Sequence, residues 1–321
     1  MNILITSAGQ RVSLVRAFKK ELKKTFSTSM VYTVDMNPSL SPACQVSDGF
    51  KTVKRVDDND YIKELVTICK EWQIKLVIPT IDTELIFLSK NKLLFKNEGI
   101  EVIVSNEDFI KKCRDKRLIN LFFEEHKIDI PKPYDKLNPE FPLFIKPYDG
   151  SLSKDVFLIK NKDELNEYHF TNEKLMFMEY IDPNSFDEFT IDAYYDRNGE
   201  LKCAVPRKRI AVRSGEINKG VTCKNFILDY LKDKLPKIEG ALGCLTIQVF
   251  YGLDANRIIG IEINPRFGGG FPLSYLSGAN YPLWIIKEYL MNEEIIFFND
   301  WEDNLLMLRY DDEVLVHNYE K

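Results

Sequence analysis

Residues 245–270 read Leu-Thr-Ile-Gln-Val-Phe-Tyr-Gly-Leu-Asp-Ala-Asn-Arg-Ile-Ile-Gly-Ile-Glu-Ile-Asn-Pro-Arg-Phe-Gly-Gly-Gly, and this stretch decides the interpretation of the whole chain. Two runs of strand-forming residues flank the turn-prone segment 252–256, so we predict an antiparallel hairpin centred on Ala255. Pairing about that centre places Gln248 directly opposite Glu262, with Cβ atoms about 5 Å apart. The hairpin prediction is therefore also a prediction of which side chains meet.

One face of the predicted hairpin is polar. Because side chains alternate along a strand, Gln248, Glu262 and Asn264 share that face. One carboxylate and two amide oxygens suit Mg²⁺ (or Mn²⁺), which takes the rest of its coordination shell from water and nucleotide phosphates. The alternative is the solvated face of an ordinary hairpin. The opposite, apolar face would carry Ile247, Val249, Ile261 and Ile263.

The residues that follow the hairpin favour the metal site. Pro265 ends the second strand, Arg266 follows at once, and Gly268–Gly270 permit a tight turn. Arg266 would lie beside metal-bound phosphate, where its charge stabilises the negative charge that develops during phosphoryl transfer. An ordinary surface arginine is the alternative.

The first third of the chain alternates short apolar runs with amphipathic segments, which predicts a parallel α/β sheet of Rossmann type. The turn after the first strand offers only Gly9, whereas a dinucleotide-binding turn uses several glycines, and this argues against a nicotinamide-dependent dehydrogenase. Strands are predicted at Ile3–Ser7, Met30–Asp35, Leu76–Pro79 and Glu101–Val104, and helices near Val12–Lys24, Asp60–Trp72 and Thr83–Lys96.

The pattern changes after about residue 107. A charged helix from Asp108 to about His126 is predicted to end before Pro131 and Pro133. The rest is predicted to be an α+β body of mostly antiparallel strands with intervening helices. The strands are Pro142–Pro147, Val156–Ile159, Leu175–Tyr180, Glu188–Tyr195, Leu201–Val212, Leu245–Tyr251 and Arg257–Asn264, and the helices lie near Lys162–Tyr168, Asn225–Leu235 and Tyr281–Met291.

The composition is that of an ordinary globular protein with more than one core, since 321 residues include 45% hydrophobic and 29% charged ones. A net charge of -5 argues against sequence-independent binding to nucleic acid. The six cysteines include no CxxC pair, so neither a disulfide framework nor a zinc site is predicted. With no apolar run of about 18 residues and no signal-like segment, we expect a cytoplasmic protein with no membrane partner.

Gln248 together with Glu262-Ile-Asn264-Pro-Arg266 resembles the metal-binding motif of the ATP-grasp superfamily, in particular of carbamoyl phosphate synthetase large-subunit-like proteins. The resemblance spans nearly the whole chain. It implies a fold class that combines α/β and α+β, with a Rossmann-like N-terminal (pre-ATP-grasp) domain followed by an ATP-grasp fold. These domains would cover residues 1–107 and 108–321, the latter divided into a nucleotide-binding subdomain at about 108–180 and a metal-binding subdomain at about 181–321.

The resemblance also implies two lysines that contact ATP, Lys116 at the start of a helix and Lys146 within Phe144-Ile-Lys-Pro. Lys146 interrupts an apolar strand, where a charge is costly to bury unless an anion pairs with it. Triphosphate would supply that anion. Ser151 and Ser153 resemble the loop that closes over the phosphates, although a plain hairpin turn explains them equally well.

The nucleoside of ATP would be bound further along the chain. Glu179, Tyr180 and Ile181 resemble the linker that binds adenine, and Glu188 resembles the carboxylate that accepts hydrogen bonds from ribose hydroxyls. The alternative is that the two glutamates flank a surface turn.

Candidate residues for the other substrate come from two regions. Alternation places Arg207, Arg209 and Arg213 on one strand face, either as a surface for a substrate carboxylate or phosphate or as a charged edge strand. Ligands of parallel sheets bind at the carboxyl ends of the strands. Arg11, Asp82 and Glu84 follow such ends in the front domain.

The resemblance implies an enzyme, a ligase that forms a C–N bond. ATP would phosphorylate a small-molecule carboxylate and an amine would attack the acyl phosphate, with Lys146 and Arg266 as the catalytic groups and ATP and Mg²⁺ as cofactors. A homodimer is a family-level expectation. The alternatives are a non-catalytic ATP-binding regulatory protein and a carbamoyl phosphate synthetase-like subunit.

Overall fold

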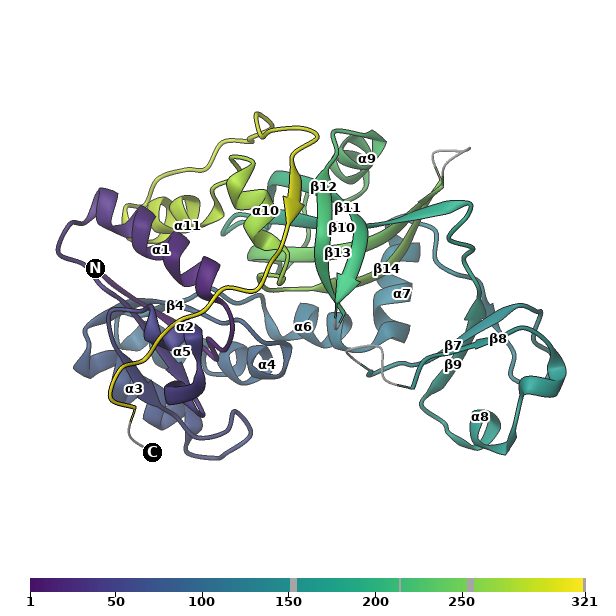
Figure 1. Cartoon of the computed structure of the whole chain (residues 1–321), viewed down its shortest axis with the longest axis horizontal. Coiled ribbons are helices and arrows are strands. Elements are labelled where there is room, and N and C mark those ends of the chain that lie inside the picture. Colours follow the sequence, from purple (N-terminus) through teal and green to yellow (C-terminus); the bar gives the residue numbers. More distant parts are fainter. Residues whose placement is uncertain (151–154, 214, 253–256, 320–321) are drawn as a thin grey trace.

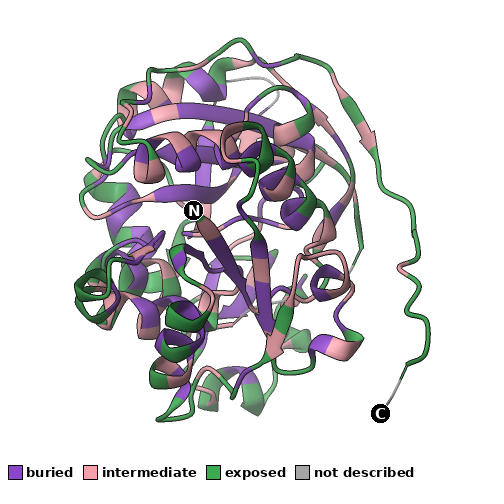
Figure 2. Cartoon of the chain, turned by 90° about the vertical axis from the view of Figure 1, so that its left-hand side faces the viewer, coloured by how far each residue is buried: buried purple, intermediate pink, exposed green. Residues whose placement is uncertain are grey.

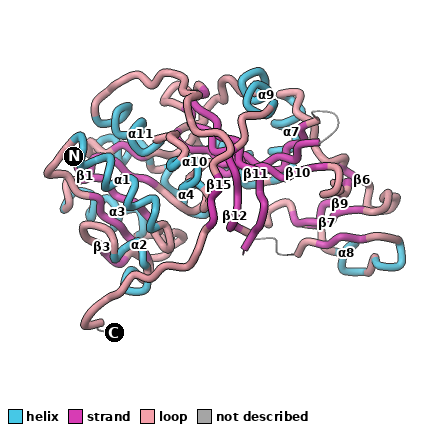
Figure 3. Tube along the Cα trace, turned by 45° about the horizontal axis from the view of Figure 1, so that its top comes forward, coloured by secondary structure: helices cyan, strands magenta, loops and turns pink. Residues whose placement is uncertain are grey.

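The computed structural model describes residues 1–150, 155–213, 215–252 and 257–319. Three sheets follow one another across the molecule: a parallel front sheet, a large antiparallel sheet in the middle and a small antiparallel sheet on the far side (Figure 3). Both predicted classes of structure, α/β at the front and α+β behind, are confirmed. Among the described residues no helix has the length and apolar character needed to cross a lipid bilayer.

The front sheet has five parallel strands in the order β3-β2-β1-β4-β5, which confirms the Rossmann-like prediction. The predicted helix Thr83–Lys96 is two helices, because Asn91 leaves helical geometry between them. The 3₁₀ turn and the short helix α2 that precede β3 were not predicted, and neither was β3 itself. The elements are β1 Asn2–Thr6, α1 Val12–Thr25, β2 Val31–Asp35, a 3₁₀ turn Pro38–Leu40, α2 Pro42–Gln45, β3 Phe50–Thr52, α3 Tyr61–Glu71, β4 Ile74–Ile78, α4 Asp82–Lys90, α5 Lys92–Asn97 and β5 Glu101–Val102.

Two helices lead from the front sheet to the small sheet. The prediction of one helix from Asp108 to His126 is wrong, because Asp115 is extended and its carboxylate accepts a hydrogen bond from the backbone N–H of Arg117. Asp115 thus ends one helix and caps the next. The elements are α6 Glu107–Arg114, α7 Lys116–Glu125, β6 Pro133–Tyr134, β7 Leu143–Pro147, β8 Phe157–Ile159, a 3₁₀ turn Lys162–Glu164, α8 Glu167–Thr171 and β9 Leu175–Glu179, with sheet order β6-β9-β7-β8.

The large sheet is antiparallel, with the order β14-β13-β10-β11-β12-β15 (Figure 1). Its edge strand β15 was not predicted, and the segment beyond it runs exposed along the outside of the molecule (Figure 2). The elements are β10 Phe186–Tyr195, β11 Leu201–Arg213, β12 Glu216–Thr222, α9 Phe226–Lys234, β13 Gly243–Gly252, β14 Ile258–Asn264, α10 Phe271–Leu276, α11 Tyr281–Leu290 and β15 Leu306–Leu308.

A shared hydrophobic core joins the front unit to the large sheet. One cluster of buried side chains contains Ile3 and Phe18 of the front unit together with Phe271 and Ile285. The rings of Phe18 and Phe267 meet edge to face, with centroids 5.9 Å apart. Close packing of this kind restricts movement of one unit relative to the other, so the front unit and the large sheet form one body.

The hairpin β13–β14 has the predicted register at its functional end. Gln248 pairs with Glu262 and Thr246 with Asn264. Beyond Gln248 the register shifts, because Val249 pairs with Gly260 and leaves Ile261 as an extra residue. The prediction that Ile261 joins the apolar core face is therefore wrong, while Ile247, Val249 and Ile263 are in the core as predicted. The turn centred on Ala255 lies outside the described residues.

Gly260 has no room for a side chain, because a Cβ atom there would approach the Phe123 ring to 2.6 Å. We expect Gly260→Ala to lower the free energy of unfolding by about 1–3 kcal/mol, the usual cost of overpacking. Urea denaturation of both proteins measures the difference. An unchanged midpoint would show that α7 is not packed on β14 as described.

Candidate functional site

A cleft of about 940 Å³ lies between the small and the large sheet, with part of its wall from α4 of the front unit. We call it the main cleft. Its lining combines residues that are far apart in the sequence, from β7, β9, β10, β11 and the hairpin β13–β14. Most of the predicted site residues lie here: Arg11, Asp82, Lys116, Lys146, Glu179, Tyr180, Ile181, Glu188, Arg207, Arg209, Gln248, Glu262, Asn264 and Arg266.

Two of the predicted metal ligands, Gln248 and Asn264, converge on one carboxylate oxygen of the third, Glu262. Glu262 Oε1 accepts hydrogen bonds from Gln248 Nε2 at 2.6 Å and from Asn264 Nδ2 at 2.9 Å. Rotation of the two amide groups would turn their oxygen atoms to the same point, so the donor set fits a hard divalent cation such as Mg²⁺. No cluster of three or more His, Cys, Asp or Glu suited to a metal occurs in the described part of the chain, so phosphates and water would have to complete the coordination shell.

Two lysines, Lys116 and Lys146, line the main cleft. Lys146 on β7 is only 9% exposed, and within the described ranges its Nζ makes no hydrogen bond. Burial and the nearby charge of Lys116 lower the pKa of Lys146 to about 8, although Glu262 opposes the shift. Lys116 donates from Nζ to the carbonyl of Gly150 at 2.6 Å. Lys146 is thus a desolvated cation without a close anion, and an anionic ligand would relieve its cost.

The end of the cleft beside β9 holds the predicted nucleoside-binding residues. Glu179 accepts a hydrogen bond from the backbone N–H of Lys132 at 3.1 Å, and Tyr180 and Ile181 follow it along the cleft wall. Glu188 lies 3.3 Å from Arg209 Nε. Burial raises the pKa of Glu188 despite that arginine. Ser151 and Ser153 lie outside the described residues.

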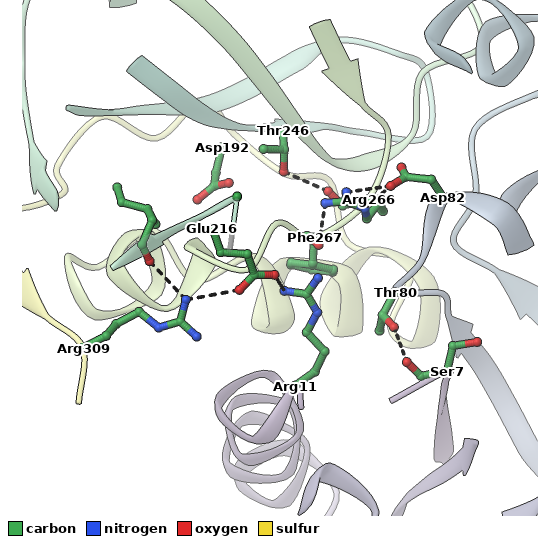
Figure 4. Close-up of polar contacts among 12 residues, drawn as sticks. Ser7, Arg11, Thr80, Asp82, Asp192, Glu216, Thr246, Arg266, Phe267 and Arg309 are labelled. Carbon is green, nitrogen blue, oxygen red and sulfur yellow. Dashed lines mark hydrogen bonds and ion pairs between the residues drawn. The ribbon is translucent and has the colours of Figure 1, made fainter. Parts of the chain in front are cut away.

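Arg266 is held by the front unit. Its Nη2 and Nε atoms lie 2.6 and 3.0 Å from Asp82 Oδ2, at the first residue of α4. Thr246 donates a hydrogen bond to the backbone carbonyl of Arg266 at 3.0 Å (Figure 4). The guanidinium therefore has a fixed place at the end of the hairpin, and it lines the same cleft as Glu262 and Asn264.

The prediction that three arginines share one face of β11 is wrong. Arg207 and Arg209 line the main cleft, but the register of β11 shifts between Arg209 and Val212, and Arg213 turns away to pair with Asp311. The irregular pairing with β12 reverses the alternation of side chains.

Arg207 is 1% exposed and is fixed by one partner. Its Nη2 donates to Asp192 at 2.9 Å, and Ser274 donates to the other oxygen of that carboxylate at 2.6 Å. In the described ranges its Nε and Nη1 atoms have no hydrogen-bond partner. Both nitrogens are enclosed, so Arg207 contributes positive charge to the cleft wall rather than an exposed donor.

Glu84 is fully buried and does not reach the cleft. Its carboxylate accepts hydrogen bonds from Tyr61 and, at 2.9 Å, from Ser7, and burial raises its pKa. We therefore do not retain the hypothesis that Glu84 contacts a substrate. It holds the loop after β1 in place, and Arg11, which follows that loop, pairs with Glu216 at 3.3 Å.

Two family models match separate parts of the sequence. The PylC-like N-terminal domain matches residues 3–103, and the model described as ATP-grasp in the biosynthetic pathway with Ter operon matches residues 171–305. The second match includes the whole hairpin with its converging Gln248, Glu262 and Asn264. Residues 171–305 are thus similar to a family of ATP-grasp proteins. The narrower likeness to carbamoyl phosphate synthetase large subunits stays a prediction, and no curated protein matches the sequence significantly.

Solved structures have the same ATP-grasp fold at low sequence identity. The biotin carboxylase domain of 2-oxoglutarate carboxylase from Hydrogenobacter thermophilus is 12% identical, over 95% of this chain and 73% of that one, with a TM-score of 0.69. N5-carboxyaminoimidazole synthetase from Staphylococcus aureus is 15% identical, over 96% and 79%, with a TM-score of 0.70. L-amino acid ligase from Bacillus licheniformis is 15% identical, over 90% and 74%, with a TM-score of 0.66.

Sequence reasoning missed several polar residues around the main cleft. One is Thr246, which pairs with Asn264 and donates a hydrogen bond to the backbone carbonyl of Arg266. Glu216 and Arg309 also meet near the site, at 3.2 Å, and neither belongs to a motif. Alternation along β13 could have indicated Thr246, since it lies on the same face as Gln248. No sequence signal indicates the pairing of Glu216 with Arg309.

Proposed function

We propose that this ATP-grasp chain is a ligase that activates a carboxylate with ATP and joins it to an amine. The carboxylate oxygen attacks the γ-phosphorus and releases ADP, and the amine then attacks the acyl phosphate and releases phosphate and a proton. The convergence of Gln248 and Asn264 on Glu262, in the same cleft as Lys146 and Arg266, carries the proposal. These groups position and neutralise phosphate, so no covalent bond to the enzyme is needed.

The proposed roles follow from the contacts in the cleft. Gln248, Glu262 and Asn264 would hold Mg²⁺ (or Mn²⁺), which when bound supplies positive charge and orientation to the phosphates. Lys146 and Lys116 would bind phosphate oxygens, since both ammonium groups line the cleft. Arg266 would stabilise charge on the transferring phosphoryl group after exchanging part of its contact with Asp82.

The remaining assignments concern the nucleoside and the substrate. We propose that Glu179, Tyr180 and Ile181 contact adenine and that Glu188 accepts hydrogen bonds from ribose, since they form one end of the main cleft. Arg207, Arg209, Arg11 and Asp82 are proposed to face the other substrate. Ser151 and Ser153 keep their proposed place over the phosphates.

Three structural relatives support the proposal through what their names say. The Hydrogenobacter biotin carboxylase domain was solved with MgADP and bicarbonate, and the Staphylococcus synthetase with ADP. The Bacillus relative is an L-amino acid ligase. Each name describes that protein, and together they make ATP and a carboxylate or amine the natural substrates to test here.

The proposal extends to the organisation of the protein. We propose a pre-ATP-grasp domain at residues 1–107 and an ATP-grasp domain at residues 108–321, with its subdomains divided near residue 180. A cytoplasmic location and a homodimer are also proposed. The Hydrogenobacter relative is described as a domain dimer, which supports the latter.

A regulatory protein that binds ATP without turnover is the alternative function. Such a protein needs the phosphate-binding lysines but has no use for Arg266 beside the metal ligands, and this favours the ligase. A carbamoyl phosphate synthetase-like subunit is a second alternative, for which ADP release that depends on bicarbonate, without hydroxamate, is the expected result.

We expect the protein to form hydroxamates when it is incubated with MgATP, hydroxylamine and a panel of small carboxylates. Hydroxylamine traps an acyl phosphate, so hydroxamate and ADP should appear in equal amounts and only with Mg²⁺ and a suitable carboxylate. Colorimetric hydroxamate detection and coupled ADP detection measure both. Tight MgATP binding without either product across the panel would favour the regulatory alternative.

A further inference from the structure

A second cavity, of about 670 Å³, adjoins the main cleft on the side of the front unit. It lies between the loop after β1, the start of β12, the glycine turn 268–270 and the segment after β15. Arg11, Glu216, Gly268 and Gly269 line both spaces. The two spaces are therefore neighbours that have these lining residues in common.

Three arginines from separate parts of the chain line the second cavity. They are Arg11 at the start of α1, Arg213 at the end of β11 and Arg309 just after β15. Arg11 and Arg309 share one carboxylate, at 3.3 and 3.2 Å from the two oxygens of Glu216 (Figure 4). Arg213 lies 2.9 Å from Asp311.

The charges of this cavity are not balanced. Among the lining residues that the structure describes, three guanidinium groups stand against two carboxylates, Glu216 and Asp311, which gives this part of the lining an excess positive charge. Burial lowers the pKa of Arg11, and the neighbouring Arg266 and Arg309 add to this effect, while Glu216 and Asp82 oppose it. An excess of cations favours an anionic ligand, which would reduce their mutual repulsion.

The pairing of Arg213 with Asp311 is easily exchanged. Both side chains are exposed, at 66% and 82% of their surface, so the ion pair contributes little to stability. Arg309 is also partly exposed and uses a single nitrogen for its contact with Glu216. Both guanidinium groups therefore have N–H donors free for a planar or tetrahedral oxyanion.

The rest of the lining limits the ligand to a small molecule with an apolar part. Leu14, Phe271, Pro272 and Tyr310 of the exposed C-terminal segment add apolar surface to the lining. The volume is within the range of small-molecule sites.

We propose that the second cavity binds the co-substrate of the ligase through a carboxylate or phosphate group, which is held between Arg213 and Arg309. The reacting end of that molecule faces the shared residues Arg11 and Glu216, on the side of the cavity nearest the main cleft and Arg266. The inference rests on the proposed function and adds the chemical class of the co-substrate: a small anionic molecule rather than a neutral amine or ammonia. The C-terminal segment contributes to its specificity through Arg309 and Tyr310.

The test uses succinate and inorganic phosphate as probes for the two oxyanions. Each is titrated by calorimetry into the full chain saturated with Mg²⁺ and a non-hydrolysable ATP analogue, which fills the phosphate positions of the main cleft. We expect at least one probe to bind, and Arg213→Gln and Arg309→Gln each to raise its Kd about tenfold or more. The probe that binds more tightly identifies the group.

Arg55→Gln is the matched control, since it removes an arginine from an exposed ion pair with Asp57 outside both cavities. It should leave both affinities unchanged, and neither cavity variant should alter the Kd of the nucleotide analogue. Failure of both probes to bind, or equal binding to wild type and both variants, would overturn the inference. The same titrations without nucleotide separate the two proposals: arginine-dependent probe binding in a protein that binds no nucleotide would contradict the ligase assignment only.

Discussion

Glu262→Ala is expected to reduce Mg²⁺-dependent ATP turnover by about 10²- to 10³-fold, the usual effect of deleting a key electrostatic group from an active site. Glu262 supplies the single carboxylate on which Gln248 and Asn264 converge. Without it, two neutral amides remain, and these bind Mg²⁺ weakly. ADP release at saturating MgATP measures the effect.

The matched control is Glu294→Ala, because Glu294 is an exposed carboxylate outside the main cleft. Both variants should have the circular dichroism spectrum of the wild type, since Glu262 is only half-buried and lies at the cleft surface. Undiminished turnover in Glu262→Ala would remove the metal site from the proposal, while an equal loss in both variants would indicate a general defect.

The site could be predicted where it depends on local periodicity. The pairing of Gln248 with Glu262 follows from the centre of the hairpin, and the structure has that register. The parallel front sheet follows in the same way from alternating apolar and amphipathic segments. In both cases neighbouring residues in the chain carry all the information that the prediction uses.

Irregular geometry limited the prediction even over short distances. The extra residue at Ile261 and the register shifts after Arg209 each reverse the side-chain alternation, and both mispredicted faces lie beyond such a shift. The break at Asp115 was also missed, because a capping carboxylate inside a charged stretch resembles an ordinary helical residue. The sequence pattern does not mark these positions.

Contacts between distant segments could not be predicted. Arg266 and Asp82 are 184 residues apart. Glu216 with Arg309 and Arg213 with Asp311 join the large sheet to a segment near the end of the chain. Each of these pairs depends on how the units pack, and periodicity along one strand or helix says nothing about that. The second cavity consists almost entirely of such contacts.

Lys146→Met is expected to weaken nucleotide binding about 10- to 100-fold, which corresponds to the loss of one or two charge-assisted hydrogen bonds. Methionine keeps most of the side-chain volume in β7, so packing is conserved. Calorimetric titration with MgADP and a non-hydrolysable ATP analogue measures the affinity. Lys160→Met, an exposed position outside the cleft, is the control. An unaltered affinity for both nucleotides would remove Lys146 from the proposed phosphate site.

The pH dependence gives a second, independent test of Lys146. Its pKa is about 8 in the folded protein, below the ordinary value of 10.5, so folding disfavours the charged form. This destabilisation is fully present below pH 8 and decreases as the pH rises from about 8 toward 10.5. Lys146→Met should therefore be more stable than wild type at pH 7, and the difference in free energy of unfolding should shrink above pH 8.

Nucleotide affinity of the wild type should fall over the same range, because the neutral amine attracts phosphate weakly, whereas the nucleotide affinity of the variant should stay constant. Parallel pH profiles for the two proteins would contradict the assignment.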